Sequence, residues 1–116
     1  MPQLQMNTRQ SGDVTVVDFS GAITLSVASH TVRDAVRELV SAGNRKTLLN
    51  MRHVAYIDSY GIGELVAGYS SLRNAGGTLK LLSPTKHVKD MLVITNLYNI
   101  FDVQENEETG ILSFAA

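Results

Sequence analysis

The feature that most constrains the fold is a repeated switch between two spacings of apolar residues. Short apolar runs, typical of buried strands, occupy residues 47–51 and 78–82. Stripes with the three- and four-residue spacing of a helix alternate with them. Strands joined through helices pair in parallel, so the pattern predicts an α/β fold. The two stripes consist of Val32, Ala35, Val36, Leu39 and Val40, and of Ile62, Leu65, Val66, Tyr69 and Leu72.

The flanking segments complete the predicted order of elements. Residues 4–9 and 14–20 are strand-like and are separated by Gly12, which suits a tight hairpin turn. Residues 54–57 follow the run at 47–51 after a turn and lead into Asp58. A third helix starts at residues 83–85, and a short strand covers 100–103. Residues 105–114 suit a terminal helix, although Gly110 costs it about 1 kcal/mol relative to alanine.

Together these elements predict a single domain over residues 1–116. Its sheet is mixed: an N-terminal antiparallel hairpin is followed by parallel strands packed with α-helices. Such a domain is large enough for its own core, because 44% of its 116 residues are hydrophobic.

Charge and composition exclude several classes of function. The formal charge is −1 and the basic residues are scattered, which argues against direct nucleic-acid binding. The absence of cysteine excludes disulfides, thiolate zinc sites and iron–sulfur clusters. The longest apolar run is four residues, 91–94, and no secretory signal precedes residue 10. We therefore expect a cytoplasmic protein without membrane insertion.

One segment, Asp58-Ser59-Tyr60-Gly61-Ile62-Gly63, stands at the junction between a strand and the second helical stripe. Either Asp58 or Ser59 can accept a hydrogen bond from the helix start. Gly61 and Gly63 fall in or near the first helical turn, where each costs up to about 1 kcal/mol relative to alanine. Close approach of another surface is one compensation for that cost. Tyr60 lies outside the apolar stripe and is expected to be exposed, whereas Tyr69 belongs to the core.

This segment, together with several others at matching spacing, resembles the STAS domain family, and in particular the bacterial anti-sigma factor antagonists. The likeness covers nearly the whole chain. Tyr60 departs from the family, which usually has a small Ser or Thr there, and Thr24 stands where an Asp is common. The matching segments are Gly21-Ala22-Ile23, Leu48-Leu49-Asn50-Met51, Ile57 to Gly63, Gly76-Gly77-Thr78-Leu79 and Thr95-Asn96-Leu97-Tyr98-Asn99-Ile100-Phe101.

The resemblance implies a function by partner exchange. It implies that Ser59 is phosphorylated by a partner that is both an anti-sigma factor and a serine kinase, and that a PP2C-type phosphatase reverses the modification. The unphosphorylated form binds the anti-sigma factor and so releases a sigma factor. The partner would contact Asp58, Ser59, Tyr60, Gly61, Ile62 and Gly63. The alternative is an accessory STAS subunit of a membrane lipid-transport complex, which needs no phosphorylation.

We find no motif for catalysis or for a cofactor. Gly61-Ile62-Gly63 lacks the third glycine of a dinucleotide site, because position 66 is Val. The histidines His30, His53 and His87 are far apart in sequence, which favours solvated or capping roles over metal binding. The serine-hydrolase motif G-x-S-x-G is absent. Residues 86–89 are read as the solvated face of a helix rather than as an anion site. We therefore expect a binding protein with no cofactor and no enzyme activity.

Overall fold

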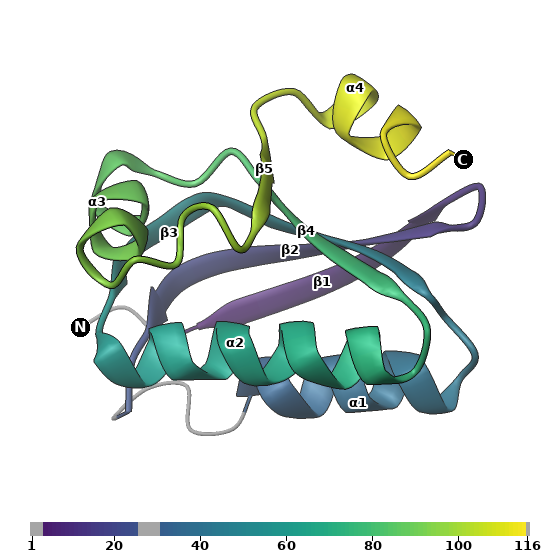
Figure 1. The fold of residues 1–116 in the computed structure, drawn as a ribbon, viewed down its shortest axis with the longest axis horizontal. Coiled ribbons are helices and arrows are strands. Elements are labelled where there is room, and N and C mark those ends of the chain that lie inside the picture. The colour runs from purple at the N-terminus through teal and green to yellow at the C-terminus, as the bar shows by residue number, and fades with distance from the viewer. Residues whose placement is uncertain (1–3, 26–30, 116) are drawn as a thin grey trace.

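The computed structural model describes residues 4–25 and 31–115, which form a five-stranded sheet with helices on both faces (Figure 1). The sheet has the order β1-β2-β3-β4-β5. Its strands β1 and β2 pair antiparallel, and all later neighbours pair in parallel. This is the mixed sheet that the alternating periodicities predict. The strands are β1 (Gln5–Ser11), β2 (Val14–Ile23), β3 (Lys46–Ile57), β4 (Thr78–Leu82) and β5 (Asp102–Gln104).

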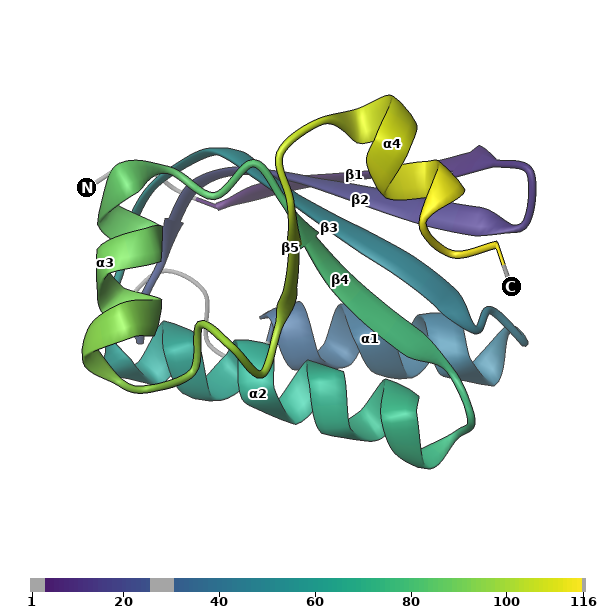
Figure 2. The same ribbon diagram turned by 45° about the horizontal axis from the view of Figure 1, so that its top comes forward.

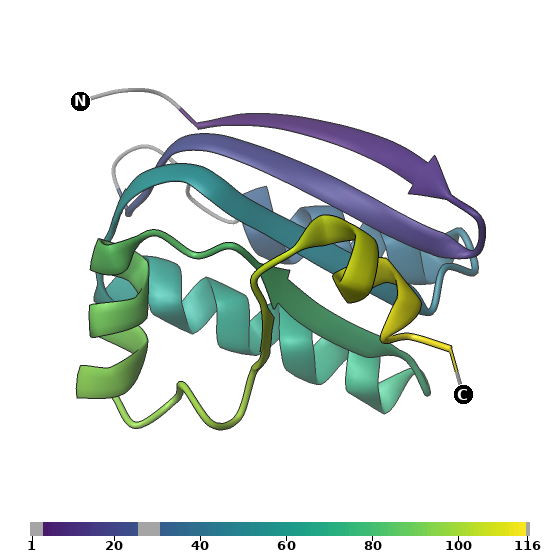
Figure 3. The same ribbon diagram turned by 90° about the horizontal axis from the view of Figure 1, so that it is seen from above.

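Helices cover the sheet unequally. Two of them, α1 (Thr31–Ser41) and α2 (Ser59–Asn74), lie side by side under one face (Figures 1 and 2). The third, α3 (Lys86–Ile94), packs at one end of the sheet, and the short α4 (Glu107–Leu112) lies over the opposite face (Figure 3). The apolar stripes of α1 and α2 face the sheet, because buried Val36 and Leu65 belong to the same core cluster as Leu49.

A second, smaller core lies between the sheet and α4. Phe114 packs there against Val14, Val16, Leu48 and Leu82. The close packing of α4 accounts for the glycine at position 110, since a Cβ there would come within 3.2 Å of Gln104. The terminal helix predicted over residues 105–114 is present, but it is shorter and covers only Glu107–Leu112.

A buried lysine holds α4 in place. Lys80 on β4 is 8% exposed, and its ammonium group donates to the carbonyl oxygen of Ser113 at 2.9 Å. It also pairs with Asp102 at 3.2 Å and lies 4.8 Å from the ring centre of Phe114. A cation at a helix C-terminus stabilises the helix dipole.

The structure corrects three element boundaries. Residues 47–51 and 54–57 belong to one long strand, β3, and the expected turn is a pair of register shifts against β2. Such shifts bend a strand without ending it. The second strand continues past Gly21 to Ile23, and the last strand covers Asp102–Gln104 instead of residues 100–103.

Within residues 4–25 and 31–115, no helix combines the length and the apolar character that a membrane crossing requires.

Candidate functional site

The first turn of α2 is fixed by the side chain of Asp58. This residue is the N-cap, with extended backbone angles, and its Oδ1 accepts a hydrogen bond of 2.8 Å from the Gly61 N–H. Its Oδ2 accepts from the Leu25 N–H at 3.3 Å, so one carboxylate joins the helix start to the segment after β2. Of the two caps that the sequence allows, the structure selects Asp58 over Ser59.

Ser59 is the first residue of α2, and it is exposed. At this position the side chain lies next to the helix N-terminus, where backbone N–H groups and the helix dipole favour negative charge. The backbone around Ser59 is held in place, because Asp58 before it and Gly61 after it are hydrogen-bonded to each other.

The two glycines of the motif have different explanations. A Cβ at Gly61 would overlap the carbonyl oxygen of Ile23 and lie 2.6 Å from Cγ1 of Ile57. Gly61 is therefore required by the close approach of β2 and β3 inside the domain, and no partner surface is needed to explain it. Gly63 is exposed, and a Cβ there would meet no atom within 4 Å. Internal packing does not explain Gly63.

The remaining motif residues lie at different depths. Tyr60 is half-buried, which corrects the expectation that it is exposed, and it takes part in a contact within the fold. Ile62 is 4% exposed and belongs to the main core. Since Gly61 is buried as well, the side chains that reach the surface come from Ser59 and, in part, Asp58 and Tyr60.

Two aromatic residues that the sequence did not single out for this site lie close to it. Tyr56 stacks on His87 with ring centres 4.8 Å apart and planes 17° apart. His87 Nε2 lies 3.1 Å from the carbonyl oxygen of Ile57, the residue directly before Asp58. His87 is thus half-buried against the end of β3, rather than on a solvated helix face as expected. Local sequence patterns could not indicate this contact, because His87 and Ile57 are 30 residues apart in the chain.

An ion pair with a buried carboxylate joins the start of α1 to α2. Glu64 is 4% exposed, and its carboxylate accepts from the Arg33 backbone N–H at 3.3 Å. Its other oxygen lies 3.4 Å from Arg33 Nε. Glu64 therefore supplies a hydrogen-bond acceptor for the first turn of α1 from another helix. The sequence pattern of α2 did not indicate this role. Glu64 lies outside the apolar stripe, so the pattern places it with the ordinary polar residues of a helix.

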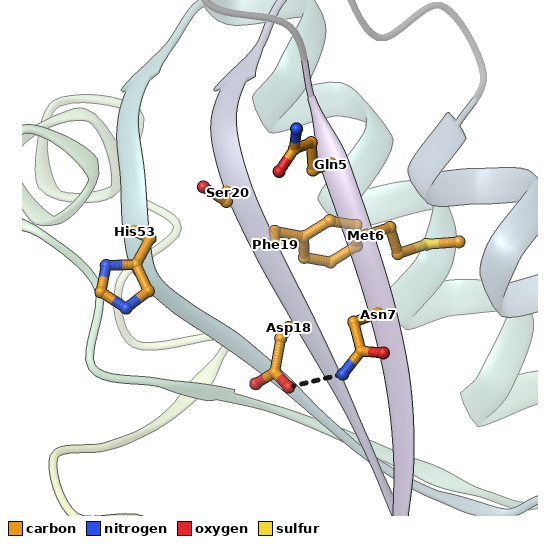
Figure 4. Close-up of a pocket in the computed structure, with 7 residues that line it drawn as sticks. All are labelled: Gln5, Met6, Asn7, Asp18, Phe19, Ser20 and His53. Atoms are coloured by element: carbon orange, nitrogen blue, oxygen red, sulfur yellow. Dashed lines mark hydrogen bonds between the residues drawn. The ribbon is translucent and has the colours of Figure 1, made fainter.

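A shallow hollow of about 210 Å³ lies on β1, β2 and β3 (Figure 4). Asp18, Ser20 and His53 line it together with Gln5, Met6, Asn7 and Phe19. The Asp18 carboxylate accepts from Arg9 Nε at 2.7 Å, from Asn50 at 2.8 Å and from Asn7 at 3.4 Å. These bonds, that to Arg9 above all, lower the pKa of Asp18 to about 2. Asp18 is therefore committed to a structural network rather than to orienting the imidazole of His53.

The structure also bears on metal binding. His53 and His87 lie in different settings, one in the hollow and one against Tyr56, and His30 lies outside the described residues. In the part of the chain that the structure covers, no three His, Asp or Glu side chains converge as a metal site would require.

The fold and the junction define a class of protein: an α/β domain that presents an exposed serine at the start of an aspartate-capped helix, next to the end of a parallel strand. The chain belongs to the STAS domain family, whose model matches residues 5–110. The resemblance drawn from the sequence motifs is thereby confirmed at the level of the family.

The named relatives carry the names of anti-sigma factor antagonists. The anti-sigma-B factor antagonist of Bacillus subtilis (strain 168) is 25% identical over 108 residues, which cover 93% of this chain and 97% of that protein. A Thermotoga neapolitana protein, provisionally named as an anti-sigma factor antagonist, is 35% identical over 68 residues. That match covers 59% of this chain and 60% of the relative, less than two thirds of its length.

Solved structures share the fold. An anti-sigma factor antagonist from Mycobacterium paratuberculosis has a TM-score of 0.84 at 18% identity, with 97% of this chain and 94% of that chain covered. The Bacillus cell fate determinant SpoIIAA in its phosphorylated form has a TM-score of 0.72 at 17% identity, with 97% and 99% covered. At these identities the likeness establishes the fold alone.

Proposed function

We propose that this chain is an anti-sigma factor antagonist, with residues 1–116 acting as one STAS domain in the cytoplasm. The unphosphorylated chain binds an anti-sigma factor that is also a serine kinase, and so releases a sigma factor. The kinase phosphorylates Ser59 and thereby ends the binding, and a PP2C-type phosphatase restores it. The chain itself binds rather than catalyses, and it uses no cofactor.

The observation that carries the proposal is the position of Ser59. Its side chain is exposed as the first residue of α2, on a turn that Asp58 fixes through Gly61. A kinase needs such an accessible hydroxyl. The names of the relatives, and the existence of SpoIIAA in a phosphorylated form, support the same reading.

Electrostatics explains how a phosphate would act there. A phosphoserine carries roughly −1.5 to −2 charges at pH 7, and the helix N-terminus accommodates it. The neighbouring Asp58 carboxylate repels it: two unit charges about 6 Å apart at an effective dielectric of 20 interact by about 2 to 3 kcal/mol. The added charge and volume would therefore oppose a partner surface that packs on the unmodified serine.

The proposed contact surface is narrower than the motif. It comprises Asp58, Ser59, Tyr60 and Gly63, because Gly61 and Ile62 are buried and support the turn from inside. Tyr60 replaces the small residue usual in the family, and we propose that it helps to select the particular anti-sigma factor.

The test is phosphorylation by purified components. Each serine-kinase anti-sigma factor of the source organism is incubated with the chain and radiolabelled ATP, and the modified residue is identified by mass spectrometry. We expect label on Ser59 and none on Ser59→Ala. A matched control is Ser70→Ala, which removes another exposed serine of the same helix and should leave labelling intact.

If no kinase labels the wild-type chain while the chain still binds a transport ATPase, the phosphorylation-independent adaptor becomes the better explanation. Label on a residue other than Ser59 would retain the partner class but reject the assigned site.

A further inference from the structure

Two exposed apolar side chains border the turn that carries Ser59. Leu25 is 61% exposed, and its backbone N–H donates to the Asp58 carboxylate at 3.3 Å. Tyr56 is 44% exposed and lies near the end of β3, two residues before Asp58. Neither side chain belongs to the core clusters, so burial in the core does not account for large apolar groups at these positions.

The backbone of Leu25 and the ring of Tyr56 are held in place before any partner arrives. The Leu25 backbone is tied to Asp58, and the Tyr56 ring stacks on His87. His87 is in turn held by its 3.1 Å contact with the carbonyl oxygen of Ile57. Figures 1 and 2 show α3, which carries His87, beside the end of β3 and the start of α2. Because its ring is already ordered, Tyr56 loses little conformational entropy on binding, which favours it as a contact residue.

An interface of ordinary size is wide enough for one partner to cover Ser59, Leu25 and Tyr56 together. A stable protein complex buries about 800 Å² on each partner, equivalent to a disc about 16 Å in radius. Three residues of extended chain span at most about 11 Å, so Tyr56 lies within that radius of Ser59. Leu25 also lies within it, because its N–H contacts the side chain of Asp58, the residue next to Ser59.

We propose that Leu25 and Tyr56 are contact residues for the same anti-sigma factor that recognises Ser59. The proposal rests on the proposed function. The partner surface presents apolar side chains opposite Leu25 and Tyr56, around the group that receives the Ser59 hydroxyl. Tyrosine is one of the residues most often found to dominate binding energy when its ring is covered. Affinity is then supplied by Leu25 and Tyr56, and Ser59 regulates it.

The test compares variants by calorimetric titration against the anti-sigma factor that binds the wild-type chain. We expect Tyr56→Ala to weaken binding by at least about tenfold. Leu25→Ser removes apolar area from the contact and should weaken binding by at least about fivefold. Tyr56→Phe keeps the ring and should recover most of the affinity. The matched control is Leu112→Ser: Leu112 is 65% exposed on α4, at the opposite end of the molecule, and its replacement should change affinity less than twofold (Figure 1). Thermal unfolding of each variant shows whether the fold is intact.

The outcomes separate the two proposals. If Ser59→Asp weakens binding but Tyr56→Ala and Leu25→Ser bind as the wild type does, this inference is rejected and the antagonist function stands. If every anti-sigma factor fails to bind the wild-type chain, both are rejected. Sedimentation of the chain alone tests a second copy as occupant: self-association that Tyr56→Ala abolishes would assign this surface to a homodimer instead.

Discussion

Gly61 lies against the carbonyl oxygen of Ile23 so closely that no side chain fits between α2 and the end of β2. The same carbonyl oxygen is 3.4 Å from the Asp58 N–H, so the first turn of α2 and the end of β2 meet backbone to backbone. This contact fixes the first turn of α2, which carries Ser59, relative to the end of β2, and it makes the junction sensitive to the addition of a single methyl group.

We expect Gly61→Ala to destabilise the domain by at least about 1 to 3 kcal/mol, because overpacking against backbone cannot be relieved by a rotamer change. Urea unfolding of the variant and the wild type measures the difference. If Gly61→Ala and the wild type unfold at the same urea concentration, the start of α2 and the end of β2 are farther apart than the structure places them.

Gly63→Ala should behave in the opposite way. No atom lies within 4 Å of the added Cβ, and alanine is favoured over glycine in a helix by about 1 kcal/mol, so stability should rise by up to that amount. If the partner approaches the α2 backbone closely, binding to the anti-sigma factor should fall in the same variant. Unchanged affinity would remove Gly63 from the proposed contact surface.

Asp58→Ala should lower stability by about 1 kcal/mol, since it removes the cap on Gly61 and the acceptor for the Leu25 N–H. Asp58→Asn keeps an acceptor oxygen and should lose less. Chemical denaturation of both variants tests this order. Equal losses would indicate that the charge of Asp58, and not its hydrogen bonds, stabilises the turn.

Stability should depend on acid through Asp18. Hydrogen bonds from Arg9, and then from Asn50 and Asn7, hold the pKa of Asp18 near 2, below the value of about 3.9 in an unfolded chain. A lowered pKa stabilises the fold above the unfolded pKa, and the contribution is lost as the pH falls toward 2. The difference in unfolding free energy between wild type and Asp18→Asn should shrink from about 2 kcal/mol at pH 7 to below about 0.5 kcal/mol at pH 2, where the folded-state carboxyl group is half protonated. A difference that stays constant over this range would contradict the ion pair with Arg9.

Phosphorylation of Ser59, or Ser59→Asp as a partial mimic, should weaken binding to the anti-sigma factor by at least about 1.4 kcal/mol, or tenfold, with little change in stability. Ser59→Ala should retain binding, because Asp58 and not Ser59 caps the helix. Calorimetric titration of the three proteins measures both effects. Equal affinities for all three would leave the adaptor function as the better explanation.

Local sequence was sufficient for the order of the helices and strands and for the place of the junction, but not for the unbroken length of β3. The spacing of Val36 and Leu65 within their stripes follows from 3.6 residues per turn, and the change to that spacing after Ile57 places the start of α2. Asp58 and Ser59 were both recognisable as caps, since capping depends only on residues a few positions apart.

Tertiary structure decided what each of these residues does. Asp58 caps the helix, and its second carboxylate oxygen accepts a hydrogen bond from the Leu25 N–H. Gly61 is required because the carbonyl oxygen of Ile23, at the end of β2, leaves no room for a Cβ. The stack of Tyr56 on His87 and the pairing of Glu64 with Arg33 likewise join residues from separate elements. Periodicity reports which face of an element is apolar, but it carries no information on which distant backbone or side chain that face will meet. Those contacts exist only after the crossovers have closed the sheet and its helices into one core.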